Sequence, residues 1–149
     1  PMGDRCYLEI TLRRADLDRF GKHLDAAPGE SWWDHLDDEQ DQPGIVTVSV
    51  YEANYAWYDE RAAAAKEGID FHGWHAEGGE YGPCGFVSYR KKHVEVAHDH
   101  DGDLVIAVDE NLKPLTSMAH LRRYVRTLKK VKAMFAQEKA THMHLKPAA

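Results

Sequence analysis

Histidines gather in the second half of the sequence, among side chains that can bind metals. The chain has ten histidines in 149 residues. A candidate metal set combines His72, His75, His98 and Asp99, because imidazoles and carboxylates on neighbouring strands can hold zinc or another transition metal. His72 and His75 are three residues apart, so a regular strand would point them to opposite faces unless the chain breaks at Gly73. We therefore expect hydrogen-bonded or solvated histidines and no metal or other cofactor, with the metal site as an alternative.

Cys84 has a setting that allows nucleophilic chemistry. It lies in a glycine-rich segment near His75, where a thiol ionises more easily. An enzyme that depends on a metal or on this cysteine, within the region from His72 to His100, is therefore an alternative function. A free cysteine is more often a small packing residue, and Cys6 alternates with apolar neighbours. The two cysteines have no CxxC spacing, which favours a reducing, cytoplasmic location.

The same glycine-rich segment offers a second alternative, a site for a small molecule. Residues 77–85 contain four glycines and a proline, too many for regular structure. Such a loop can bring backbone close to another group. With Trp74, Glu80 and Tyr81 beside it, the loop is a candidate site for a nucleotide-like ring.

Aromatic residues cluster around an acidic stretch in the first half of the sequence. Some of them must belong to the core, because a domain of this size needs large apolar side chains. Others stand next to acidic residues or at the start of a helix, and exposed Trp and Tyr beside a polar rim often anchor a recognition surface. The candidate aromatic contacts are Trp32, Trp33, Tyr55, Trp57 and Tyr58.

Charge is sorted along the chain. Residues 16–60 contain twelve Asp or Glu and two Lys or Arg, whereas residues 113–146 contain nine Lys or Arg and one acid. Two surfaces of opposite sign, or neutralisation of one by the other, would explain this pattern. Nucleic acid could bind only through the basic C-terminal helix, because the whole chain has a formal charge of -6. The candidate acidic contacts for a protein partner are Asp34, Asp37, Asp38, Glu39 and Asp41.

Residues 99–110 resemble the calcium loop of EF-hand proteins. Acidic residues occupy its first, third, fifth and twelfth places, where oxygen ligands would converge on a cation. The sixth place departs from the pattern, because Leu104 stands where a sharp turn needs glycine. The flanking segments also have the pattern of strands, so we interpret residues 99–103 as a hairpin turn.

Periodicity indicates the elements that position these residues. Alternating apolar residues predict strands, and apolar residues at a spacing of three and four predict helices. No apolar run reaches the roughly 18 residues of a membrane span. We expect a single α+β domain over residues 1–149, mainly an antiparallel sheet of five or six strands packed by two short helices and a long C-terminal helix. The C-terminal helix and one or both of the short helices are expected to cover one face. The terminal residues 1–3 and 140–149 are expected to be flexible. Strands are expected at 6–12, 45–51, 71–75, 86–89, 93–97 and 104–108, and helices at 16–24, from Asn54 to Gly68, and from Ser117 onward.

These features favour a small binding protein without catalytic activity. Its acidic and aromatic surface would dock on a larger protein and inhibit or modulate it. A negative surface can mimic nucleic acid toward a basic groove, so an enzyme that handles nucleic acid is the expected kind of partner. The cysteine or metal enzyme and the small-molecule binder remain the alternatives.

Overall fold

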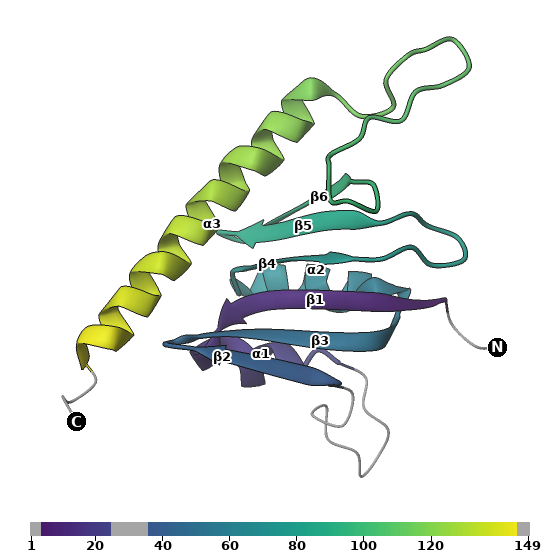
Figure 1. The fold of residues 1–149 in the computed structure, drawn as a ribbon. Helices are drawn as coiled ribbons and strands as arrows, with labels where there is room; N and C mark the ends of the chain where they lie inside the picture. Colours follow the sequence, from purple (N-terminus) through teal and green to yellow (C-terminus); the bar gives the residue numbers. More distant parts are fainter. Residues whose placement is uncertain (1–3, 25–35, 146–149) are drawn as a thin grey trace.

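A computed structural model describes residues 4–24 and 36–145 of the chain, and a single antiparallel sheet lies at its centre (Figure 1). The six strands lie in the order β2-β3-β1-β4-β5-β6. The α+β class expected from the sequence is confirmed. The strands are β1 Arg5–Arg13, β2 Asp38–Gln42, β3 Ile45–Asn54, β4 Phe71–His75, β5 Cys84–Tyr89 and β6 Lys92–Ala97.

Three α-helices accompany the sheet within the described ranges. They are α1 Leu17–Gly21, α2 Tyr58–Glu67 and α3 Met118–Leu145, and the 3-10 turns η1 Arg14–Asp16 and η3 Tyr55–Trp57 precede the first two. The neighbours β4-β1-β3-β2, with α1 after β1 and α2 after β3, follow the split β-α-β order of ferredoxin-like folds. No helix in these ranges combines the length and the apolar character needed to cross a bilayer.

Helices cover both faces of the sheet. On one face, Leu8 and Ile10 of β1 pack in a core with Phe20 of α1 and residues of α2. On the other face, Val87 of β5 packs in a second core with Val131 of α3. The expectation that the helices cover one face is therefore wrong for α3. The reason is that β5 has apolar residues on both sides, Phe86 toward the first core and Val87 toward the second, and Val94 and Val96 of β6 extend the second side.

Local expectations fail where a strand depends on its partner. The acidic residues of β2 have low strand propensity, but they pair with β3 along the sheet edge and all five are exposed. Residues 104–108 were expected to form a strand, which is wrong: Leu104 and Val108 make only isolated bridges, and Val105 donates a single backbone hydrogen bond to Ala97 at the end of β6. The helix α3 continues to Leu145, beyond residue 140, where the loss of periodicity predicted its end. Its cap is confirmed, because Ser117 Oγ accepts the N–H of His120 at 3.1 Å.

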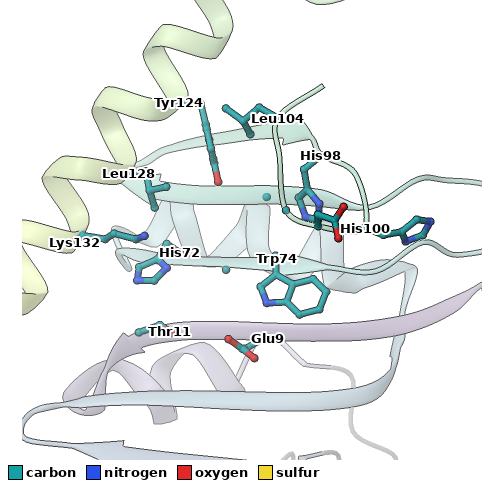
Figure 2. A pocket seen from close by; sticks show the side chains of 14 residues that line it. Glu9, Thr11, His72, Trp74, His98, His100, Leu104, Tyr124, Leu128 and Lys132 are labelled. Carbon is teal, nitrogen blue, oxygen red and sulfur yellow. The ribbon is translucent and has the colours of Figure 1, made fainter. Parts of the chain in front are cut away.

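The helix α3 crosses the sheet obliquely and roofs a cavity of about 430 Å³ (Figure 2). The floor is formed by β1, β4 and β5, and the loop after β6 closes one side. Gly85 makes the close approach of helix and sheet possible, because a Cβ at this position would lie 2.4 Å from the hydroxyl of Tyr124.

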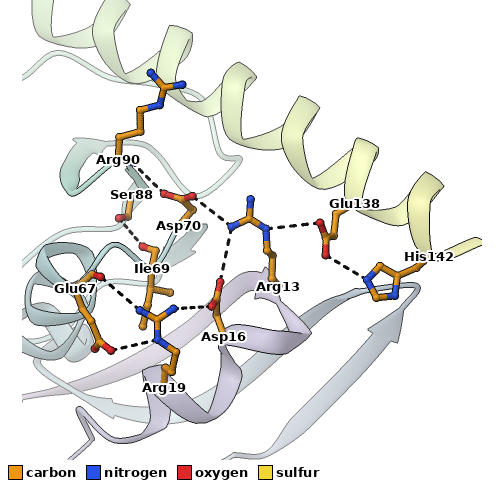
Figure 3. Close-up of polar contacts among 10 residues, drawn as sticks. All are labelled: Arg13, Asp16, Arg19, Glu67, Ile69, Asp70, Ser88, Arg90, Glu138 and His142. Carbon is orange, nitrogen blue, oxygen red and sulfur yellow. Dashed lines mark hydrogen bonds and ion pairs between the residues drawn. The ribbon is translucent and has the colours of Figure 1, made fainter. Parts of the chain in front are cut away.

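One arginine connects the early part of the chain with α3 (Figure 3). Arg13, at the end of β1, lies 3.5 Å from Asp70 and 3.8 Å from Asp16 through Nη1. Its Nε lies 3.9 Å from Glu138, the one acidic residue between 113 and 146. The C-terminal half of α3 is therefore tied to the sheet through its own carboxylate and a basic residue of β1.

Candidate functional site

Three strands bring His75, Cys84 and Glu95 together on the face that α2 covers. In the register of β4 and β5, His75 lies opposite Cys84, and Glu95 of β6 lies opposite Phe86, two residues along β5. One ring nitrogen of His75, Sγ of Cys84 and a carboxylate oxygen of Glu95 all lie within 4.8 Å of one another. We refer to these three residues as the thiol centre.

Arg61 of α2 covers the thiol centre and is itself 0% exposed. Its Nη2 donates to Glu95 Oε1, its Nε donates to the carbonyl of Ala56 and its Nη1 donates to Nε2 of His93, each at 2.9 Å. The guanidinium also stacks on the ring of Phe86, 4.0 Å from its centroid. A buried arginine retains its charge, so these contacts replace the water that it has lost.

A left-handed turn presents one of these partners. Tyr55, Ala56 and Trp57 have φ values of 49°, 52° and 53°, although none of them is glycine. Such backbone costs about 1–3 kcal/mol per residue and persists only where surrounding contacts hold it. The bond from Arg61 to the Ala56 carbonyl and the burial of Trp57 are such contacts.

His75 faces an acceptor with each ring nitrogen. Nδ1 lies 2.9 Å from the carbonyl oxygen of Ala76, and Nε2 lies 3.3 Å from Glu95 Oε1. Both nitrogens must therefore carry hydrogen, which is the imidazolium form. Burial opposes this charge, but hydrogen bonds with Cys6, Cys84, Glu95 and the backbone outweigh it and raise the pKa of His75 to about 11.

The other ionisable groups fix the charge of the site. Burial would raise the pKa of Glu95, but the hydrogen bond with His75 and the charge of Arg61 lower it to about 2. Burial, together with the charge of Arg61, lowers the pKa of His93 to about 4, so His93 is neutral and accepts from Arg61. Two cations, Arg61 and His75, thus surround one carboxylate.

Cys84 is the member of the thiol centre that β5 contributes. It is only partly buried, and its S–H points to the carbonyl of Gly82 at 3.7 Å. Cys6 is 5% exposed and closes the centre from β1. The ring of Tyr81 packs edge-on against His75, with centroids 5.5 Å apart, and burial and Cys6 raise the pKa of Tyr81, so its hydroxyl stays neutral. Cys84 is thus the thiol of the chain that is partly exposed, whereas Cys6 is buried.

The thiol centre is also the set of described residues that could hold a metal, because thiolate, imidazole and carboxylate are all zinc ligands. The metal set considered from the sequence is not brought together. His72 and His98 line the cavity under α3, on the face opposite to His75. Asp99 serves a turn instead, since its Oδ1 accepts the backbone N–H of Asp101 and of Asp103 at 2.9 Å. This use of the carboxylate accords with the turn interpretation of the segment that resembles an EF-hand loop.

The glycine-rich loop does not form the small-molecule site considered from the sequence. Its backbone is held by Asp4, whose carboxylate accepts from the N–H of Gly79 at 2.7 Å and of Glu80 at 2.8 Å. Tyr81 packs toward the thiol centre, whereas Trp74 lines the cavity on the other face. The loop therefore binds the N-terminus of its own chain.

The acidic and aromatic residues of the expected docking surface are divided. Trp32, Trp33 and Asp34 lie outside the described residues. Tyr55 and Tyr58 are 51% and 52% exposed, but Trp57 is 7% exposed and belongs to the core, which corrects its expected place on the surface.

On the edge strand, Glu39 and Asp41 pair with Arg14 of the same chain. The carboxylate of Asp37 accepts the backbone N–H of Tyr51 at 2.6 Å. The carboxylate of Asp38 accepts the backbone N–H of Glu39 at 2.9 Å. The edge strand is thus acidic and exposed, and its charge is partly neutralised by Arg14.

Sequence reasoning missed Arg61 and Glu95. An arginine in a helix is usually interpreted as solvated, but Arg61 lies four residues after Trp57 and three and four before Ala64 and Ala65, all of them buried. This helical spacing was a usable signal. Glu95 shares the parity of His93 on β6, and this alternation could have placed both on one face.

No protein-family model, no curated protein and no solved structure matches this chain. We therefore infer function from the residues of the thiol centre alone.

Proposed function

We propose that the chain is a cysteine-dependent enzyme in which Cys84 is the nucleophile and His75 its proton partner. The observation that carries this proposal is the position of the His75 ring, with Ala76 O at 2.9 Å from one nitrogen, Glu95 Oε1 at 3.3 Å from the other, and Cys84 in the same cluster. An imidazolium next to a thiol favours the thiolate, which is the nucleophilic form.

The charges around the centre support the same conclusion. Arg61 is fully buried and His75 is 3% exposed, and Glu95 is the carboxylate that contacts both. A pair of buried cations with one anion is unfavourable in a medium of low dielectric constant. Cys84 lies next to this excess of positive charge, in the same cluster. Cys6 and Cys84 are both free, and a reducing compartment such as the cytoplasm would keep them so.

The proposed reaction is the transfer or hydrolysis of an acyl group. The Cys84 thiolate attacks the acyl carbon, the sulfur–carbon bond forms, and the bond to the leaving group breaks. The leaving group takes the proton that His75 carries. Water then attacks the same carbon and gives a proton to His75, and the electrons of the sulfur–carbon bond return to Cys84. Glu95 and Arg61 hold the imidazole in place and are positioning residues.

The test is the rate at which iodoacetamide labels Cys84 at pH 7, followed by mass spectrometry. We expect Cys84 to react roughly tenfold or more faster than glutathione, because the thiolate is the reactive form. His75→Gln should remove this advantage, whereas the matched variant His100→Gln, at an exposed histidine, should retain it. Turnover of a panel of chromogenic acyl esters should be lost in Cys84→Ser and retained in His100→Gln.

Two results would contradict the proposal, one from labelling of Cys84 and one from metal analysis. Labelling of wild-type Cys84 no faster than glutathione would reject an activated thiol, even if His75→Gln fails to fold. Stoichiometric zinc in protein purified without a histidine tag, with labelling only after a chelator is added, would identify the thiol centre as a metal site instead.

A second candidate function is docking on a larger protein with a basic groove, which the chain would inhibit or modulate. It is favoured by the edge strand β2, whose residues are all exposed, and by the exposed rings of Tyr51, Tyr55 and Tyr58. Replacement of Asp37, Asp38, Glu39 and Asp41 by Ser should weaken association with a captured partner and flatten its dependence on salt. Replacement of Asp101 and Asp103 by Ser is the control, and equal binding by all three proteins would contradict docking through β2.

A further inference from the structure

The cavity under α3 has the size of a ligand site and lies on the sheet face opposite to the thiol centre. Its volume of about 430 Å³ lies within the range of small-molecule sites. Tyr124, Leu128 and Lys132, one helical turn apart, form its roof (Figure 2). Gly85 in the floor carries no side chain, and a Cβ at this position would point toward the Tyr124 hydroxyl in the roof.

An aromatic row runs from this cavity across the open part of the sheet. Trp74 lines the cavity and is 38% exposed. Its ring centroid lies 5.2 Å from that of Tyr7, which lies 5.9 Å from that of Tyr51. These rings come from β4, β1 and β3, so they form a stacking surface for flat rings that extends beyond the cavity.

Polar groups lie at two ends of the cavity. Glu9 pairs with Trp74 in the register of β1 and β4, and Thr11 pairs with His72. These two pairs are two residues apart along the strands, which is roughly 7 Å. Lys132 lies on the His72 side, where its charge, after burial, helps to lower the pKa of His72 to about 4. The cavity thus has a carboxylate next to the indole and an ammonium near a neutral imidazole.

Glu9 and Lys132 bring charges to the cavity from β1 and α3. Across residues 4–24 and 36–145, neither Glu9 nor Lys132 takes part in an ion pair. Glu9 accepts a hydrogen bond of 3.3 Å from the Tyr7 hydroxyl, which leaves further lone pairs for a ligand. His98 Nδ1 faces the carbonyl of Asp99 at 2.6 Å, so its Nε2 is left as an acceptor at the rim.

We propose that this cavity binds a nucleotide unit, with the base stacked on Trp74, the N–H donors of the base toward Glu9, and the phosphate beside Lys132. Stacking on an indole is tolerant of the base, whereas the carboxylate and the ammonium give the ligand its direction. A free nucleotide and a single-stranded RNA share this chemistry. In the RNA, Tyr7 and Tyr51 would stack the neighbouring bases.

The test is isothermal titration of the full chain with GMP, AMP, guanosine and a single-stranded RNA of about ten nucleotides. Trp74→Ala should weaken binding of every ligand by roughly tenfold. Lys132→Gln should weaken the binding of GMP by about tenfold but leave the binding of guanosine unchanged, because guanosine has no phosphate. The matched variant Lys130→Gln, on the other side of α3 beside Arg123 and Thr127, should bind like the wild type.

Each outcome separates the alternatives. RNA that binds much more tightly than GMP identifies a single strand as the ligand, and equal affinity identifies the free nucleotide. No measurable heat with any of the four ligands overturns the proposal. Binding that is unaffected by both Trp74→Ala and Lys132→Gln also overturns it, and Lys132 is exposed, so its variant is not expected to unfold. The titrations do not involve Cys84, so their failure would leave the proposed enzyme activity untouched.

Discussion

The two faces of the sheet differ in how their charges are satisfied, although neighbouring residues of the same strands build both. His75 and Cys84 face α2, where Arg61 and Glu95 fill the space and pair with them. Trp74 and Gly85 face α3, where a cavity of about 430 Å³ remains and Glu9 and Lys132 have no ion pair among the described residues. The buried charges of one face therefore pair with one another, whereas those of Glu9 and Lys132 on the other face border a cavity.

Loss of the buried carboxylate should have the largest effect on stability. Glu95→Gln removes the anion beside Arg61 and His75, and leaves two buried cations without compensation. We expect a loss of about 3–5 kcal/mol in the free energy of unfolding, measured by urea denaturation. Glu52→Gln is the matched control, because Glu52 pairs with Arg5 at the surface and such pairs contribute about 0–1 kcal/mol. Equal stability of the two variants would mean that the α2 face does not depend on its charge network.

Acid should destabilise both faces through one histidine on each. The pKa of His72, on the α3 face, and that of His93, on the α2 face, are lowered mainly by burial from 6.5 to about 4. Because the folded state favours the neutral imidazole, the free energy of unfolding falls as pH falls from 6.5 to 4. The loss is on the order of 3 kcal/mol per histidine.

Glu95 and His75 of the thiol centre titrate outside the range from pH 6.5 to 4. The contribution of Glu95 is lost only as pH falls from 4.5 to about 2, and that of His75 as pH rises from 6.5 to about 11. Urea denaturation at a series of pH values checks this, and His72→Asn and His93→Asn should each flatten the curve between pH 6.5 and 4. A flat curve for the wild-type chain would show that neither histidine is held neutral.

The two glycines in the floor of the cavity should respond differently to a methyl group. A Cβ at Gly73 would lie 2.1 Å from the backbone oxygen of Glu9, whereas a Cβ at Gly85 would meet the terminal hydroxyl of Tyr124 at 2.4 Å. Gly73→Ala should therefore lower the unfolding free energy by about 1–3 kcal/mol, and Gly85→Ala by less. Gly82→Ala is the control, because no atom lies within 4 Å of its Cβ position. A larger loss of unfolding free energy in Gly85→Ala than in Gly73→Ala would indicate that packing is tighter on the α3 face.

The smallest expected effect concerns the cap of the helix that roofs the cavity. Ser117→Ala removes the hydrogen bond to the N–H of His120 and should cost about 1 kcal/mol. Ser117→Asp should restore it. Thermal unfolding followed by circular dichroism measures both, and an unchanged midpoint in Ser117→Ala would indicate that packing alone fixes the start of α3.

The sequence indicated most of the fold because alternating apolar residues report burial directly. It failed where pairing overrides propensity. The five polar residues of β2 form a strand because the edge of β3 is available. The apolar residues 104–108 do not form one, because their backbone hydrogen bonds, such as that from Val105 to Ala97, are isolated and do not continue as a ladder.

The candidate site was harder to predict than the fold. His75 and Cys84 were recognisable as reactive types, but their meeting depends on the register of two strands joined by an eight-residue loop, 76–83. Arg61 reaches them from a helix, and its burial follows from tertiary packing. A single sequence contains the residue types of such a centre and lacks the pairing information that assembles them.

Successive residues of β4 and β5 point to opposite faces, so both sites depend on the same strand register. A slip of one position would turn His75 and Cys84 into the cavity and Trp74 and Gly85 against α2. Insertions or deletions inside either strand would thus exchange the two environments and abolish both together. Length changes in the exposed part of the 76–83 connection would spare them, and this is where natural or engineered variation of this chain can occur without loss of either site.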